Sequence, residues 1–168
     1  MVEKLKHIII YIFLSMNLVG CSDDEIIHIT PSNKTYLGIL CKATMSAVFL
    51  RPVDIMDVYK IVDNKYIYVK YMRPSDATIW KNRCKIYKDR IVWGGVDVYG
   101  EGSGDSRWRE SSEDIGIVRY EYSGSFLKVW EEEKETGEIL GCLILPIDKG
   151  VALLSKARVV IGADKCRR

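Results

Sequence analysis

Cysteine and histidine are the residues whose chemistry can be judged most directly from their positions in this sequence. Five cysteines occur, at positions 21, 41, 84, 142 and 166, and the two histidines, His7 and His28, both lie near the start. Zinc sites use closely spaced ligands such as CxxC, and the sequence contains no such pair. Nucleophilic catalysis of the Ser-His-Asp or Cys-His kind needs an imidazole beside the nucleophile. We therefore expect no metal site, no cofactor and no enzymatic activity.

The first cysteine follows a segment with three parts. Residues 1–20 contain a basic start with Lys4 and Lys6, an apolar core from Ile8 to Leu18, and a small residue, Gly20, at the end. This order is typical of a secretory signal peptide. The apolar core has about half of the ~20 residues that a membrane-spanning helix needs, so export is the better interpretation.

The end of this segment, Leu18-Val19-Gly20-Cys21, resembles the lipobox of bacterial lipoproteins. The resemblance implies that the Cys21 thiol carries diacylglycerol, that the leader is cut just before it, and that the new amino group is acylated, for example with palmitate. Each buried methylene contributes ~0.8 kcal/mol, so two or three chains hold a protein on a membrane almost permanently. Ser22 stands where an Asp would retain an enterobacterial lipoprotein in the inner membrane. The resemblance thus implies an outer-membrane lipoprotein that faces the periplasm.

Four cysteines remain after Cys21, which is an even number in an exported protein: Cys41, Cys84, Cys142 and Cys166. Disulfides persist in the oxidising periplasm, so we expect two of them. Three pairings are possible, and the sequence does not choose among them.

Composition indicates one folded domain behind a short tether. Removal of Lys4, Lys6 and Glu3 with the leader would change the formal net charge from +2 to +1, which gives no global attraction for nucleic acid or anionic lipid. An apolar content of 48%, with ten Tyr and four Trp, argues against a disordered chain. We expect a signal peptide at 1–20, a lipidated tether at 21–34 and a single β-rich domain at 35–168.

Strand-like segments dominate the predicted domain. Seven of them, mostly separated by short polar turns, span residues 56–62, 66–73, 78–87, 91–98, 116–122, 126–133 and 138–145, the last ending before Pro146. Connections of two to five residues cannot join parallel neighbours. Within 78–87, one face would hold Trp80, Cys84 and Ile86, and the other would hold Lys81, Arg83, Lys85 and Tyr87. We expect an all-β fold, an antiparallel meander that forms a small closed or cracked barrel, with a two-sheet sandwich as the alternative.

Two segments remain ambiguous. Residues 35–50 are apolar at too many positions for either the helical or the strand period to prevail, so a flanking helix and a first buried strand are both allowed. Residues 149–163 could add a short helix or a final strand that covers an edge of the sheet.

A glycine-rich loop, GGVDVYGEGSGDSRW at 94–108, lacks the motifs of phosphate-binding loops and is interpreted as a long hairpin loop. Trp, Tyr and Arg are enriched in protein interfaces, and five such residues predict a partner-binding surface here: Trp93, Tyr99, Arg107, Trp108 and Arg109. The alternative is that Trp108 is a core residue and that the two arginines pair with Glu110 and Glu121.

Acidic residues also gather around this loop: Asp97, Glu101, Asp105, Glu113 and Asp114. A glycosidase-type acid and base would need two such carboxyls at a defined separation in a cleft. The run Glu131 to Glu135 is interpreted as the solvated end of a hairpin.

The leading functional hypothesis is a lipid-anchored, non-catalytic envelope protein whose β-domain binds a protein partner and no nucleic acid. This class includes accessory subunits of secretion or conjugation systems and exclusion or immunity factors. A second hypothesis is a carrier that holds a small apolar ligand in a cavity lined by Ile67, Val69, Trp80, Val92 and Leu127. A third is a cell-wall hydrolase that works through Asp or Glu residues.

Overall fold

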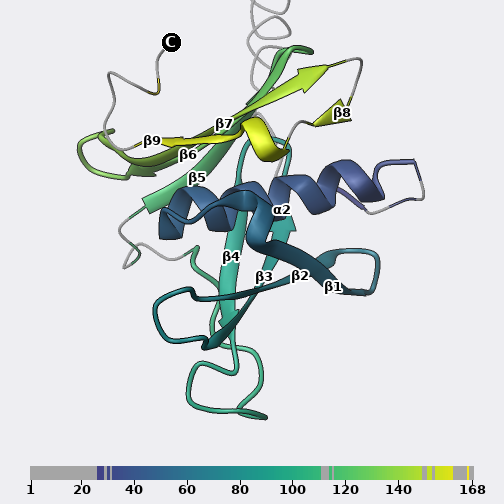
Figure 1. The fold of residues 1–168 in the computed structure, drawn as a ribbon, viewed down its shortest axis with the longest axis vertical. Helices are drawn as coiled ribbons and strands as arrows, with labels where there is room; N and C mark the ends of the chain where they lie inside the picture. The colour runs from purple at the N-terminus through teal and green to yellow at the C-terminus, as the bar shows by residue number, and fades with distance from the viewer. Residues whose placement is uncertain are drawn as a thin grey trace, which may run out of the picture.

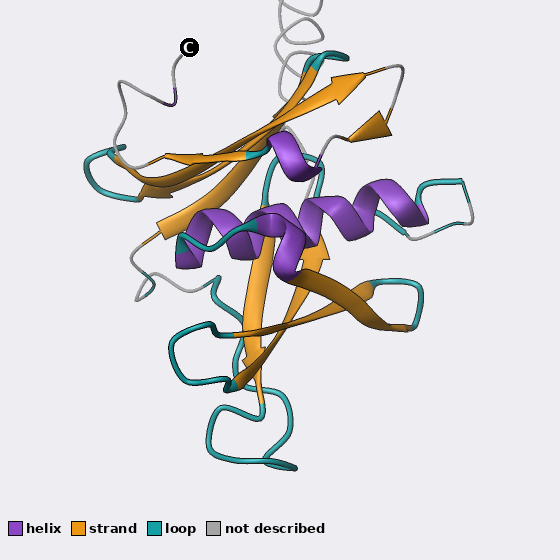
Figure 2. Ribbon diagram, in the orientation of Figure 1, coloured by secondary structure: helices purple, strands orange, loops and turns teal. Residues whose placement is uncertain are grey.

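A computed structural model of the protein describes residues 26–28, 30, 32–110, 114, 116–148, 151–152, 154–160 and 166. The strands of this part, orange in Figure 2, form one antiparallel sheet. Their order is β1-β2-β3-β4-β5-β6-β7-β8, and β9 also pairs with β7. Their bounds are β1 (Met56–Val62), β2 (Tyr66–Met72), β3 (Ile79–Ile86), β4 (Ile91–Val96), β5 (Gly116–Tyr122), β6 (Phe126–Glu133), β7 (Ile139–Asp148), β8 (Val151–Ala152) and β9 (Arg158–Val160). The prediction of an antiparallel meander in an open barrel with one helix is confirmed.

The helix α2 (Lys34–Phe49) lies in the concave side of the curved sheet, between β1–β3 and β6–β9 (Figure 1). It ends at Phe49, and the next residue, Leu50, has a left-handed backbone with a φ of 53°, just before Pro52 stops any continuation. Because both halves of the sheet contact the helix, side chains on most of its surface are buried. Gly141 on β7 permits this packing, since a Cβ there would lie 2.2 Å from the carbonyl oxygen of Ala47.

The core lies between α2 and the sheet. Its largest fully buried side chains include Leu37, Leu40, Met45, Ile67, Val69, Leu127, Leu143 and Leu145. Burial of each such side chain contributes roughly 1.5–3 kcal/mol, so contact between the helix and sheet dominates the stability of the domain. The predicted faces of β3 are confirmed, because Cys84 and Ile86 are buried in this core and Lys85 lies on the outer face.

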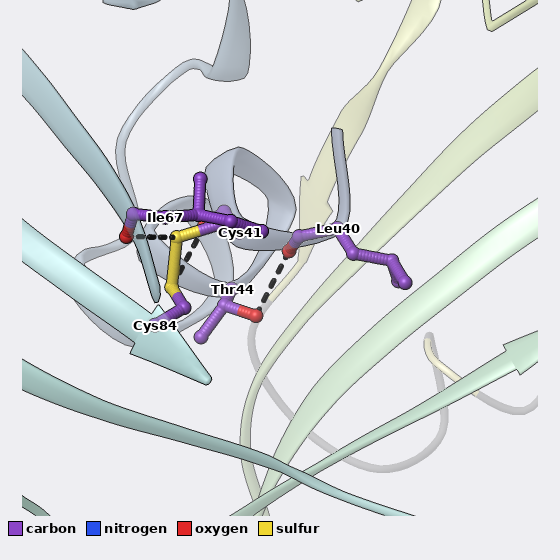
Figure 3. Close-up of a disulfide and its surroundings, with 5 residues drawn as sticks. All are labelled: Leu40, Cys41, Thr44, Ile67 and Cys84. Atoms are coloured by element: carbon purple, nitrogen blue, oxygen red, sulfur yellow. Dashed lines mark hydrogen bonds between the residues drawn. A yellow bond between two sulfur atoms is a disulfide. The ribbon is translucent and has the colours of Figure 1, made fainter. Parts of the chain in front are cut away.

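The structure forms two disulfides among the four remaining cysteines. Cys41 on α2 is bonded to Cys84 on β3, with 5.8 Å between their Cα atoms, and Cys41 Sγ lies 3.7 Å from the carbonyl oxygen of Ile67 (Figure 3). Cys142 on β7 is bonded to Cys166 near the C-terminus. The first bond fastens the helix to the sheet, and the second attaches the end of the chain to β7.

Strand β7 continues past Pro146, where the sequence predicted an end. Ile147 donates its backbone N–H to Ser125, toward β6. Neighbouring residues of a strand direct their backbone groups to opposite sides, so the nitrogen of Pro146 faces away from β6. On that side β9 pairs only with residues 142–144 and β8 with 147–148. A residue without an N–H is therefore tolerated at position 146.

The described chain begins against the sheet. Ile26 forms an isolated β-bridge with Tyr87, and Ile27 donates its backbone N–H to the Ile86 carbonyl at 2.7 Å. These residues belong to the segment predicted as a tether, and they contact the end of β3. Cys21 and the predicted leader lie outside the described residues.

Candidate functional site

The β4–β5 loop, residues 97–110, folds back along β4. Its returning part forms isolated bridges between Val96 and Asp105 and between Trp93 and Arg109. Ser106 donates its N–H to Gly95 at 2.9 Å, and Arg109 donates to Trp93 at 2.7 Å. Strands β4 and β5 pair only at Ile91 and Val118, so the loop takes the place of β5 beside the second half of β4.

Gly94 and Arg83 fix the position of this loop on the outer face of the sheet. A Cβ at Gly94 would lie 2.8 Å from the carbonyl oxygen of Arg107, so the loop can approach β4 only at a glycine. Arg83 on β3 donates to Asp105 Oδ2 at 2.5 Å and to the Ser106 carbonyl at 2.6 Å. The Tyr68 hydroxyl on β2 donates to the same Asp105 oxygen at 2.9 Å.

Trp108 completes this arrangement from the loop side. The Arg83 guanidinium carbon lies 3.9 Å from the Trp108 ring centroid, and Lys85 Nζ lies 4.8 Å from it. The Tyr66 ring packs on the same indole at 5.6 Å. Cations over an indole ring are favourable by about 0.5–1 kcal/mol at exposed sites. We refer to Tyr68, Arg83, Asp105 and Trp108 as the outer-face cluster.

The alternative interpretation of the loop, a core tryptophan with Arg107 and Arg109 paired to Glu110 and Glu121, is wrong in its details. Trp108 is half-buried on the outer face, away from α2. Arg107 binds Asp114 through two nitrogens, at 2.8 and 3.1 Å, and Arg109 lies 3.8 Å from the same carboxylate. Glu110 instead forms an ion pair with Lys85 at 3.0 Å.

The five residues predicted to bind a partner lie in three environments. Trp93 is half-buried, since one edge packs on Phe49 of α2 at 5.3 Å between ring centroids, and the Arg109 guanidinium lies 5.1 Å from its ring. The side chains of Arg107 and Arg109 are 55% and 51% exposed beside Asp114. Tyr99 is 92% exposed at the far end of the loop, and Trp108 belongs to the outer-face cluster. The structure thus brings Trp93, Arg107 and Arg109 together and keeps Tyr99 apart.

Sequence reasoning missed the residues that hold the loop. Arg83 and Lys85 were assigned to the outer face by alternation, but their pairing with the loop was not predicted. Tyr68 was not singled out. The sequence of β3 could have indicated these contacts, because its outer face presents three cations, Lys81, Arg83 and Lys85, which must either bind acidic groups or remain in water.

Three of the acidic residues predicted around the loop, Asp97, Asp105 and Asp114, form ion pairs with cations, whereas Glu101 is exposed. Lys81 lies 2.8 Å from Asp97 and, with the Gly104 N–H, holds the pKa of that carboxyl below its usual range. Asp105 and Asp114 bind arginines as described above, and Glu113 lies outside the described residues. These carboxylates stabilise the loop, whereas a general acid would need a raised pKa. Among the described residues, no group of three or more His, Cys, Asp or Glu side chains could hold a metal ion.

The prediction that residues 131–135 form the solvated end of a hairpin is wrong at Glu131. Its side chain is half-buried over Gly116, and this burial raises the pKa of Glu131 despite the nearby Arg109. The glycine leaves room on β5 for the carboxylate. Proximity of Arg109 limits the cost of burying it.

The residues proposed to line a ligand cavity have another role. Ile67, Val69 and Leu127 are buried in the core with α2, and Trp80 packs on Phe49 with 5.8 Å between ring centroids. The helix therefore occupies the concave side of the sheet. Val92 is buried as well but does not belong to this core cluster.

Comparisons with protein-family models, with curated proteins and with solved structures found no match to this chain. In the part of the chain that the structure describes, no helix is long and apolar enough to cross a bilayer.

Proposed function

We propose that this protein is a lipid-anchored lipoprotein of the bacterial outer membrane whose non-catalytic β-domain binds another envelope protein through the β4–β5 loop. Accessory subunits of secretion or conjugation systems and exclusion or immunity factors belong to this class. The observation that supports the proposal best is the fixed position of the loop, whose polar side chains serve to hold it on the sheet.

A loop that is already ordered loses less conformational entropy when it binds. Arg83, Tyr68 and Trp108 supply this order, and the exposed Tyr99, Arg107 and Arg109 are of the residue types that contribute most to binding energy. Asp97, Asp105 and Asp114 already bind cations of the same domain, which supports a role in binding a partner over acid–base chemistry.

The partner is tested by photo-crosslinking in living cells. A photoreactive phenylalanine replaces Tyr99, and a matched protein carries it at Tyr122, which is also exposed but lies at the end of β5. We expect a discrete protein adduct from position 99 and none of that size from position 122, and Arg83→Met should weaken the adduct. Equal adducts from both positions, or none from position 99 in cells that contain the partner machinery, would contradict the proposal.

The anchor is tested on the purified membrane form. Intact mass measurement should find a diacylglyceryl group and an added acyl chain on residue 21, and the variant Cys21→Ser should keep its leader and carry no lipid. An unmodified mature terminus at Cys21 would remove the anchor from the proposal. The crosslinking result would remain valid in that case.

A further inference from the structure

Apolar side chains gather at the end of the domain that carries the β4–β5 loop. Five large apolar side chains in the described part of the chain are more than half exposed, and four of them lie here: Met72 at 59%, Ile79 at 60%, Val98 at 55% and Tyr99 at 92%. The fifth, Tyr122, is at the end of β5. Exposed apolar side chains are ordinary when they are scattered, whereas a group of them marks an interaction surface. We refer to the four residues as the apolar end.

Two turns bring these residues to one end of the sheet. Met72 and Ile79 form the last pair of the β2–β3 ladder. Lys81 pairs with Val96 in the next ladder, so Ile79 and Val98 each lie two residues beyond that pair, on neighbouring segments. The β2–β3 turn and the β4–β5 loop both lie in the lower part of Figure 1.

The backbone under the apolar end is held in shape. Arg73 donates its N–H to the Thr78 carbonyl at 2.8 Å, which closes the β2–β3 turn. Val98 packs on Gly95, where a Cβ would lie 2.5 Å from Val98 Cγ1. The exposed side chains therefore project from an ordered backbone, and their burial against a partner would cost little further ordering of the chain.

We infer that the apolar end packs against an apolar, uncharged patch on the surface of the partner protein, so that the β2–β3 turn binds the same partner as the β4–β5 loop. This inference rests on the proposed function, which assigns a protein partner to the loop. It adds Met72 and Ile79 to the binding surface, and it states the chemistry of the surface that they meet.

The balance of charge supports an apolar partner surface over a charged one. Within three residues of the apolar end the sequence has three cations and three acids, so their net charge is zero: Lys70, Arg73, Lys81, Asp76, Asp97 and Glu101. Four of the six form ion pairs with one another, Arg73 with Asp76 and Lys81 with Asp97. A charged partner surface would have to separate these pairs or bury its own charges unpaired. Burial of apolar side chains is therefore the main source of affinity.

Two features favour a protein over the bilayer as the surface that is bound. Ile26, where the described chain begins after Cys21, is bridged to Tyr87 just beyond the end of β3, whereas Ile79 begins that strand. A lipid on Cys21 would thus be attached at the opposite end of β3 from the apolar end. The zero net charge also gives no attraction to anionic headgroups, unlike the basic residues that accompany membrane-binding apolar segments.

Photo-crosslinking of the full-length protein in isolated envelopes tests the inference. A photoreactive phenylalanine replaces Ile79 in one protein and Tyr99 in another, and light is applied at about 0.1 M and about 1 M salt, where the Debye lengths are ~10 and ~3 Å. We expect both positions to form an adduct with the same protein at both salt concentrations. Mass spectrometry of the digested adducts should place the crosslink from position 79 beside apolar residues of that protein.

Substitutions measure what the apolar side chains contribute. Ile79→Asp should lower the yield of the adduct from position 99 about tenfold or more, as the loss of a central apolar contact does. Tyr122→Asp also removes an exposed apolar side chain and adds the same charge, but away from the apolar end, so it should leave the yield unchanged. Thermal unfolding checks that both variants are folded, and Met72→Ser replaces Ile79→Asp if that variant is not.

The outcomes separate this inference from the proposed function. An adduct from position 99 alone, an adduct that disappears at high salt, or a loss in Tyr122→Asp equal to that in Ile79→Asp would overturn the inference and leave the proposed function in place. Crosslinks from position 79 to lipid would show that the bilayer covers the apolar end and would overturn the inference as well. The absence of adducts from both positions would overturn the inference together with the proposed function.

Discussion

Arg83 should determine whether the β4–β5 loop stays on the sheet, and Arg83→Met tests this directly. Methionine keeps much of the apolar stem but removes the two donated hydrogen bonds and the cation over Trp108. The bond to the half-exposed Asp105 is worth about 1 kcal/mol, the bond to the Ser106 carbonyl about 1 kcal/mol, and the cation–π contact about 0.5–1 kcal/mol. The free energy of loop opening should therefore fall by about 2–3 kcal/mol.

Hydrogen exchange measures this change at the backbone. The N–H groups of Ser106 and Arg109 are bonded to β4 only while the loop is closed, so their exchange should accelerate about 30- to 140-fold. Arg73→Met is the matched control, because Arg73 also binds a carboxylate, that of Asp76, and lies 4.8 Å from the Trp80 ring centroid. It should accelerate the β2–β3 turn and leave the loop unchanged. Unaltered loop exchange in Arg83→Met would refute the assigned role.

Three further predictions concern the fold. Replacing Cys41 and Cys84 together by alanine opens a covalent loop of 43 residues and should lower the free energy of unfolding by about 4 kcal/mol in urea titrations. Reductant also breaks Cys142–Cys166 in both proteins, so the variant and the wild-type protein should reach about the same stability once reduced, and a remaining difference of about 4 kcal/mol would contradict the assigned role of the bond. Burial raises the pKa of Tyr120 to about 12, against 10.0 for the unfolded side chain. The stability that the neutral phenol contributes is therefore complete below pH 10 and is lost as the pH rises toward 12. Tyr120→Phe should reduce the fall of the free energy of unfolding between pH 10 and 12, and an unchanged fall would show that another group titrates. Gly141→Ala should lower the free energy of unfolding by about 2–3 kcal/mol, because its Cβ would meet the α2 backbone. Gly38→Ala should change it by less than about 1 kcal/mol, because its Cβ would meet only a flexible side chain at 3.2 Å. Similar losses in the two variants would contradict the close packing at β7.

The strands could be predicted because their signals are local. Alternating side chains and polar turns define β1, β5 and β6 to the residue, and short connections require antiparallel neighbours. Helix α2 could not be decided in the same way. Because it lies in the concavity of the sheet and is buried on several sides, its sequence lacks the one-sided apolar stripe by which a surface helix is recognised.

The loop illustrates the same division. Its length, its glycines and its aromatic and basic residues are visible in the sequence, and they were enough to locate the candidate site. The partners of those residues come from strands 20 to 40 positions away, such as Tyr68 on β2 and Arg83 on β3, and no local pattern specifies which charges will meet.

By itself, then, the sequence determined the antiparallel meander, the number of cysteines available for disulfides and the position of the loop, because each depends on neighbours along the chain. Tertiary structure alone decided that Cys41 pairs with Cys84, that the helix occupies the concave face, and that Asp105 binds Arg83. These choices depend on which distant segments the curvature of the sheet brings into contact, and that curvature is a property of the whole assembled sheet.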